Sequence, residues 1–138
     1  SPMHMALLTS AIANGGELMK PYLIDSVKNS DGETIKTTEP EKYKRLMSVN
    51  EANLMGKLMK KVVEEGTASA LNGRGYTAAG KTGSAEFDEN GSSHSWFVGY
   101  SNVDDPDLVV AIIVENGGTG SESAVPIAGQ LFDAYYYD

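Results

Sequence analysis

The stretch GRGYTAAGKTGSAEF, residues 73 to 87, decides how the rest of the sequence is interpreted. Residues 75 to 82 fit the phosphate-loop pattern GxxxxGK[ST], in which a glycine-rich loop and the start of a helix bind a nucleotide. The same residues also fit an extended strand of small side chains that carries Lys81 and Thr82. The two interpretations require different secondary structure before and after these residues, so the flanking sequence distinguishes between them.

A phosphate loop needs a buried strand before it and a helix directly after it. Its backbone N–H groups converge on a phosphate only at a helix N-terminus. Residues 66 to 74 contain no β-branched apolar run, and Gly83 opposes a helix immediately after Thr82. Nucleotide binding therefore stays a remote alternative.

Composition limits the classes of function. The chain has 138 residues, of which 41 % are hydrophobic, which suffices for one domain with an apolar core. Its net charge of -8 disfavours nucleic acid as a partner. Cysteine is absent, and His4 and His94 lie far apart, so we expect neither a metal site nor a cofactor. No apolar run has the length of a membrane span.

Three segments have helical patterns. Residues 3 to 13 are apolar almost all round and end at Asn14-Gly15-Gly16, which predicts a helix buried on several sides with a glycine cap. Ser48 and Glu51 form a capping-box pattern at the start of a second helix, and the third runs from about residue 123 to 135. The expected apolar stripes are Leu54, Met55, Leu58, Met59, Val62 and Val63 in the second helix, and Ile127, Leu131, Phe132 and Tyr135 in the third.

The remaining segments are predicted to be strands and loops. Residues 22 to 28 and 33 to 38 flank Asn29-Ser30-Asp31-Gly32 and indicate a surface hairpin, followed by a charged linker over residues 39 to 45. Three short strands follow at residues 77 to 87, 95 to 100 and 108 to 114, and residues 117 to 120 are interpreted as a mobile connection. The chain is thus expected to be of the α/β (α+β) class.

The first of these strands has the composition of a groove wall. Most of its residues are small, while Lys81 supplies a cation, and Thr82 and Ser84 supply hydroxyl groups. Gly83 allows a bound molecule to approach the backbone closely. Such a strand can receive a peptide carboxylate.

Five segments carry a resemblance to one family. In chain order they are SPMHMALLTSAIANGG, VVEEGTA, AGKTGSAEF, HSWFVGY and SAVPIAGQLF. Together they resemble the transpeptidase domain of penicillin-binding proteins of class B, the monofunctional D,D-transpeptidases, whose third signature is K-T-G. Five segments in family order are more specific than any one of them.

The resemblance implies a β-lactamase/transpeptidase-like fold, present in part. The three strands at 77 to 87, 95 to 100 and 108 to 114 would form an antiparallel meander packed by helices, with the first strand at the edge of the groove. The third strand would pair with a strand from a missing N-terminal part of the same domain. Without that partner its exposed edge would allow a homodimer.

The resemblance also implies a reaction, the cross-linking of peptidoglycan stem peptides that end in D-Ala-D-Ala, through an acyl-serine that β-lactams also form. Lys81 and Ser84 would be catalytic: Lys81 by positive potential near the serine of the second motif, and Ser84 by donating its backbone N–H to the oxyanion. Thr82, Gly83 and Ser84 would form the substrate-binding strand and hold the substrate carboxylate.

The nucleophile is missing from this chain, because no serine is followed by a lysine three residues later as S-x-x-K requires. Ser48-Val49-Asn50 matches the second motif, S-x-N, but lies after the first helix and is better explained as a helix cap. Residues 1 to 138 are therefore expected to be the C-terminal portion of the domain, inactive alone. The parent would act at the extracytoplasmic face of the bacterial membrane, with its anchor outside these residues.

Related penicillin-recognising proteins remain alternatives. A D,D-carboxypeptidase, a β-lactamase and an antibiotic sensor would carry a similar Lys81-Thr82-Gly83 strand. The sequence that precedes Ser1 would separate them.

Overall fold

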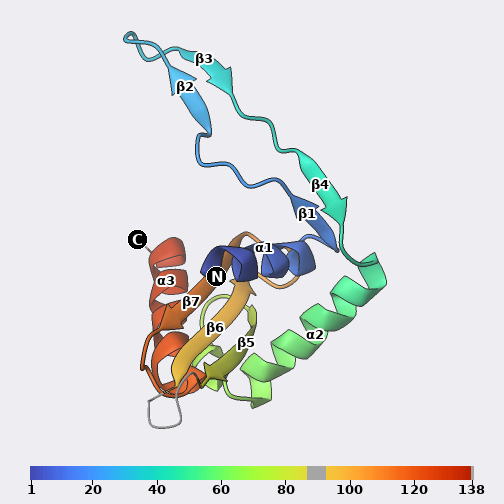
Figure 1. Ribbon diagram of the computed structural model, residues 1–138, viewed down its shortest axis with the longest axis vertical. Coiled ribbons are helices and arrows are strands. Elements are labelled where there is room, and N and C mark those ends of the chain that lie inside the picture. The colour runs from blue at the N-terminus through green and yellow to red at the C-terminus, as the bar shows by residue number, and fades with distance from the viewer. Residues whose placement is uncertain (87–92, 138) are drawn as a thin grey trace.

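A three-stranded antiparallel sheet forms the centre of the molecule in a computed structural model that describes residues 1–86 and 93–137 (Figure 1). The sheet has the order β5-β6-β7, with β5 at Ala78–Ala85, β6 at His94–Ser101 and β7 at Leu108–Val114. The predicted antiparallel meander is therefore confirmed. The expected end of its first strand at Phe87 lies outside the described residues.

Helices pack on both faces of this sheet. On one face, Phe97 of β6 and Phe132 of α3 (Val125–Tyr137) are fully buried in the main apolar cluster. On the other face, Tyr100 packs with Met59 of α2 (Val49–Glu65) and with Ile12 of α1 (Pro2–Ala13). Successive side chains of a strand point to opposite faces, so β6 contributes to both clusters.

Helix α1 begins and ends as the sequence predicts. Ser1 caps it, and its last turn closes when the Gly16 N–H donates to the Ala11 carbonyl oxygen at 2.7 Å, with Gly15 and Gly16 at φ values of +60° and +90°. Only Thr9 and Ala11 of this helix are buried, so the expected burial on several sides is not met within this chain. The reason is that α1 packs mainly against β1, β6, β7 and α2, and these elements leave most of its residues exposed or half-buried.

Helices α2 and α3 bury only part of the apolar stripes that the sequence predicts: Met59 and Val63 in α2, and Phe132 in α3. In α2 the buried residues are Ala52, Gly56, Met59 and Val63, whereas Leu54 and Leu58 are exposed. A Cβ atom at Gly56 would lie 2.6 Å from the Tyr100 hydroxyl oxygen, so a small residue is required there. In α3 the buried set is Val125, Ala128, Gly129 and Phe132, while Ile127, Leu131 and Tyr135 of the expected stripe are exposed.

A long arm, residues 17 to 45, projects from the body (Figure 1). Its tip is the predicted hairpin, where β2 (Ser26–Lys28) pairs with β3 (Thr34–Thr37) around a turn that ends at Gly32 with φ +85°. Its base pairs β1 (Glu17–Met19) with β4 (Lys42–Arg45). The interpretation of residues 39 to 45 as a linker is therefore wrong over β4.

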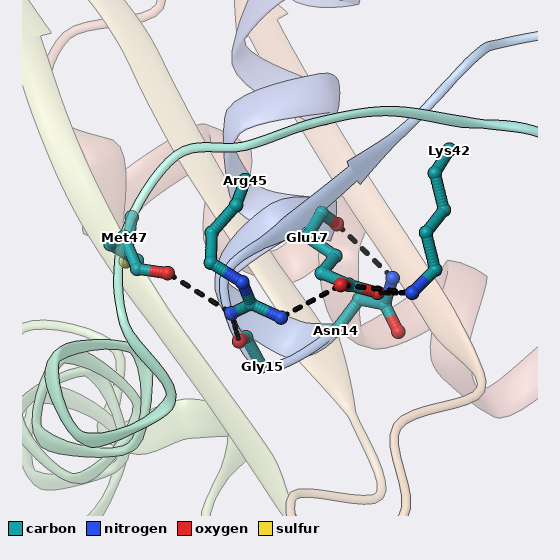
Figure 2. A network of polar contacts seen from close by, with 6 residues as sticks. All are labelled: Asn14, Gly15, Glu17, Lys42, Arg45 and Met47. Atoms are coloured by element: carbon teal, nitrogen blue, oxygen red, sulfur yellow. Dashed lines mark hydrogen bonds and ion pairs between the residues drawn. The ribbon is translucent and has the colours of Figure 1, made fainter.

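Ion pairs explain why such a charged segment forms a strand (Figure 2). The Glu17 carboxylate lies 2.8 Å from both the Lys42 ammonium and the Arg45 guanidinium, and Arg45 also donates to the carbonyl oxygens of Gly15 and Met47. A two-stranded ribbon exposed on both faces needs no apolar alternation, so its polar sequence concealed the pairing. None of the helices in the described part of the chain is long and apolar enough to cross a membrane.

Candidate functional site

Strand β5 places the predicted site residues consecutively at an edge of the sheet. Lys81, Thr82 and Gly83 lie opposite Val98, Phe97 and Trp96 of β6. Lys81 and Thr82 therefore belong to a paired strand rather than to a loop that opens a helix. The geometry that a phosphate loop requires is absent from these residues, and the nucleotide-binding alternative is wrong.

A groove of about 350 Å³ runs beside β5. Its far wall is the start of α1, so residues from the beginning and the middle of the chain face each other across it. The lining residues are Ser1, Met5, Lys81, Thr82, Gly83, Trp96 and Val98. The groove thus joins one ammonium group and hydroxyl groups with the apolar surfaces of Met5, Val98 and Trp96.

Lys81 is exposed, and its ammonium group donates to the Thr82 carbonyl oxygen at 2.6 Å. Its charge is therefore held close to the backbone of β5 and beside the groove. An ammonium at this place raises the electrostatic potential experienced by an anion in the groove.

Thr82 is mostly buried, with 9 % of its surface exposed, although it contributes to the groove lining. Its hydroxyl oxygen lies 2.5 Å from the hydroxyl oxygen of Thr67, which follows the end of α2. This contact joins the VVEEGTA segment to the K-T-G strand. Sequence reasoning identified both segments but assigned no role to Thr67.

Gly83 and Ser84 occupy the outer part of β5. A Cβ atom at Gly83 would meet the Trp96 Cβ at 3.4 Å, an ordinary contact, so packing against β6 does not require a glycine here. A need for glycine would come instead from a bound molecule close to the backbone. Ser84 is exposed and lies outside the set of residues that line the groove.

The turn at residues 120 to 124 packs against β5 and β6. It is a single π-helical turn that precedes α3, and Glu122 caps its start by accepting from the Thr119 N–H at 2.9 Å. Buried Ser95 of β6 donates to the Thr119 carbonyl oxygen at 2.8 Å and accepts from the Ala124 N–H at 3.0 Å. The interpretation of residues 117 to 120 as a mobile connection is therefore wrong where the turn is held.

Ser48 forms the helix cap that the sequence favours. Its hydroxyl oxygen accepts from the Glu51 N–H at 3.2 Å, while its own N–H donates to the Glu51 carboxylate at 2.8 Å. The hydroxyl and the backbone N–H of Ser48 are thus both engaged at the start of α2, and Ser48 is not among the residues that line the groove.

Comparisons with known proteins agree with this geometry. Residues 1–133 match the family model of the penicillin binding protein transpeptidase domain. The peptidoglycan D,D-transpeptidase PbpA of Mycolicibacterium smegmatis is 36 % identical over 92 % of this chain and 27 % of its own length. Stage V sporulation protein D of Bacillus subtilis is 33 % identical over 95 % of this chain and 22 % of its own length.

Solved structures show the same fold. The D,D-transpeptidase domain of a peptidoglycan glycosyltransferase from Eggerthella lenta has 37 % identity and a TM-score of 0.87, over 98 % of this chain and 31 % of that one. Penicillin-binding protein A from M. tuberculosis, in a ceftriaxone acyl-enzyme complex, has 31 % identity and a TM-score of 0.90 over 98 % and 32 %. The chain spans about a quarter of the length of its curated relatives. It belongs to the transpeptidase-domain family of the penicillin-binding proteins.

Proposed function

We propose that this chain is the C-terminal portion of a penicillin-binding transpeptidase domain and supplies the carboxylate-binding wall of a serine D,D-transpeptidase. The observation that carries the proposal is the groove beside β5, where Lys81 and Thr82 line the edge of the sheet. The substrate class is a peptidoglycan stem peptide ending in D-Ala-D-Ala, and β-lactams occupy the same groove.

Lys81 acts through its charge. Its ammonium group lies beside the groove, where it attracts the terminal carboxylate of the substrate and stabilises negative charge near the attacking serine. Thr82 and Ser84 donate hydroxyl hydrogen bonds to that carboxylate. A carboxylate that accepts such bonds is fixed in register along β5.

The oxyanion of the tetrahedral intermediate is stabilised in part by the Ser84 backbone N–H. Loss of one oxyanion donor in other serine enzymes costs about 3 to 4 kcal/mol of transition-state stabilisation. Gly83 lets the scissile carbonyl approach β5, in agreement with the ordinary 3.4 Å contact that leaves its position unconstrained by packing. The nucleophile itself comes from S-x-x-K in an upstream segment, with S-x-N as the second motif.

The cellular location of the complete protein follows from the reaction. Peptidoglycan is assembled outside the cytoplasmic membrane, so the active domain works at the extracytoplasmic face, with the anchor outside these residues. In the complete domain an upstream strand pairs with the edge of β7, the strand at the opposite end of the sheet from β5. In the isolated chain that edge is open to a second copy, and light scattering that finds only monomers at high concentration would contradict such a homodimer.

Labelled penicillin tests the function. The 138-residue chain is expected to form no stable adduct, whereas the same chain joined to the upstream segment that holds S-x-x-K and S-x-N is expected to be acylated. In that completed domain Lys81→Ala should slow acylation about a hundredfold or more, because it removes a charge that acts in the transition state. Lys44→Ala on the arm is the matched control and should leave the rate unchanged.

Two results would overturn the proposal. One is a completed domain that folds and is not acylated. The other is a stable adduct on the isolated chain, because the nucleophile would then lie within these residues.

A further inference from the structure

We infer that Thr67 is a positioning residue for the carboxylate site on β5: its hydroxyl group orients the Thr82 hydroxyl so that the Thr82 proton is directed at the bound carboxylate. The inference rests on the proposed function. It adds a residue outside the K-T-G strand, on the turn that follows α2. The contact that carries it is the 2.5 Å distance between the two hydroxyl oxygens.

Burial makes this contact consequential for Thr82. Only 9 % of Thr82 is exposed, so its hydroxyl has little access to water, whereas Thr67 is exposed. A buried hydroxyl depends on protein partners for its hydrogen bonds. Among the described residues, the Thr67 hydroxyl is the hydrogen-bond partner of the Thr82 hydroxyl.

The number of protons then fixes the direction of the bond. A threonine hydroxyl has one proton to donate and lone pairs to accept, while a carboxylate only accepts. Without an anion in the groove either threonine can donate to the other. Once Thr82 donates to a carboxylate, the bond between the two threonines must run from Thr67 to Thr82. Each bond in such a chain polarises the next and strengthens it.

The backbone around Thr67 holds its hydroxyl in place. The N–H groups of Gly66 and Ala68, on either side of Thr67, both donate to the Val62 carbonyl oxygen at 3.1 Å. Ala68 is fully buried in the main apolar cluster. Threonine is also branched at Cβ, which restricts χ1. The end of α2 thus positions the Thr67 hydroxyl before any ligand arrives.

Gly120 limits the other side of Thr82. A Cβ at Gly120 would lie 2.7 Å from the Thr82 Cβ, so the turn at residues 120 to 124 packs directly against this side chain. Thr82 is therefore held between the turn and the end of α2. With its side chain confined, the remaining freedom of Thr82 is rotation of its hydroxyl proton, and the Thr67 contact controls that rotation.

The test uses the completed domain and two probes, benzylpenicillin with its free carboxylate and the methyl ester of the same penicillin. Thr67→Val removes the hydroxyl and keeps the side-chain shape, and should lower the second-order acylation rate with the free acid about 3- to 10-fold, the effect of one hydrogen bond. The ester reaction should change less than about twofold, since the ester lacks the anion that Thr82 is oriented to bind. Thr67→Ser, which keeps the hydroxyl, should restore the free-acid rate.

A double mutant separates positioning from general destabilisation. If Thr67 acts through Thr82, the variant Thr67→Val/Thr82→Val reacts with the free acid no more slowly than Thr82→Val alone. The control Thr37→Val, on strand β3 of the arm, should match the unchanged domain with both probes. Should Thr67→Val fail to fold, Thr67→Ala removes the same hydroxyl with a smaller side chain.

Three results would each overturn the role of Thr67: equal slowing with the acid and the ester, additive effects in the double mutant, or an unchanged rate in Thr67→Val. Acylation of the unmodified domain would still support the proposed function in each case. If neither penicillin acylates the unmodified domain, both the function and this role are overturned.

Discussion

Gly120 and Thr82 face each other across a gap that has no room for a methyl group. A Cβ atom added at Gly120 would lie 2.7 Å from the Thr82 Cβ and 2.6 Å from the Trp96 carbonyl oxygen. Both neighbours belong to paired strands of the sheet and cannot rotate away. The turn before α3 and the site strand are therefore in direct mechanical contact.

Gly120→Ala should reduce the free energy of unfolding by about 1 to 3 kcal/mol, because relief of the overlap requires a shift of the turn or of β5. In the completed domain the same shift should slow acylation by penicillin. Denaturant unfolding of the chain and the acylation rate of the completed domain measure the two effects. Gly75→Ala is the control, because its added methyl meets the end of the Tyr137 side chain, which can move. Equal stability of the two variants would contradict the prediction.

Tyr76→Phe should weaken the packing of α3 modestly at neutral pH. The Tyr76 hydroxyl donates to the Asp133 carboxylate at 2.9 Å, and its loss should reduce the free energy of unfolding by about 1 kcal/mol. The ring contacts with Tyr136 and Phe132, at centroid distances of 4.9 Å and 5.6 Å, are retained in this variant. Denaturant titrations of the two proteins at pH 7 measure the difference.

The burial of Tyr76 also predicts a loss of stability in alkali. Burial, assisted by the hydrogen bond to Asp133, raises the pKa of Tyr76 from 10.0 to about 12. The unfolded chain therefore loses this proton first, and the free energy of unfolding should fall as the pH rises from about 10 to about 12. The free energy of unfolding of Tyr76→Phe should fall less steeply over this range. In Tyr43→Phe, on the exposed arm, it should fall with the same slope as in the unchanged chain. Identical slopes for all three proteins would count against the prediction.

Glu17→Gln should loosen the base of the arm. Hydrogen bonds from Lys42, and then from Arg45, lower the pKa of the Glu17 carboxyl group. Because the folded pKa is lowered, this stabilisation is present above the ordinary glutamate pKa and is lost as the pH falls below about 4. The Leu46 amide donates to the Gly16 carbonyl oxygen at 2.8 Å. Its protection against hydrogen exchange, relative to the intrinsic exchange rate at the same pH, should fall in the variant at pH 7 and in the unchanged chain in acid. Glu39→Gln, on the same arm, serves as the control, and exchange that is insensitive to both changes would exclude this role of Glu17.

Ser48→Ala should lower the free energy of unfolding by about 1 kcal/mol, the usual effect of losing a helix N-cap. If Ser48 acts only as a cap, the completed domain should keep its rate of acylation by penicillin. Thermal unfolding and labelled penicillin measure these effects, with Ser30→Ala at the hairpin tip as the control. A loss of acylation without a loss of stability would instead support the S-x-N interpretation.

The sequence predicted the elements that depend on local signals. The capping box at Ser48, the glycine cap after residue 13 and the Asn29 turn were all predicted, because each is decided by a few adjacent residues. The three-strand meander followed from the family resemblance. The groove-lining position of Lys81 and Thr82 agrees with the expectation, while their chemical roles stay predictions.

The buried faces of the helices were predicted only in part, for a physical reason. The predicted stripe of α2 included Met59 and Val63, which are buried, but also Leu54 and Leu58, which are exposed. Helix α2 also approaches the sheet through Ala52 and Gly56, which the stripe left out. Close approach selects small residues, and a hydrophobicity pattern gives them little weight. The contact of Thr67 with Thr82 was likewise beyond prediction, because it depends on where the end of α2 lies relative to β5.

The two ends of the arm meet where it joins the body, and the Leu46 amide there donates to the Gly16 carbonyl group. A short peptide could therefore join these two ends without displacing α1 or α2. The entropy of closing a loop changes slowly with loop length. Residues 17 to 45 are thus a segment that evolution can lengthen, shorten or replace while the strand order β5-β6-β7 and the groove stay as they are. Homologous chains are expected to diverge most in this segment.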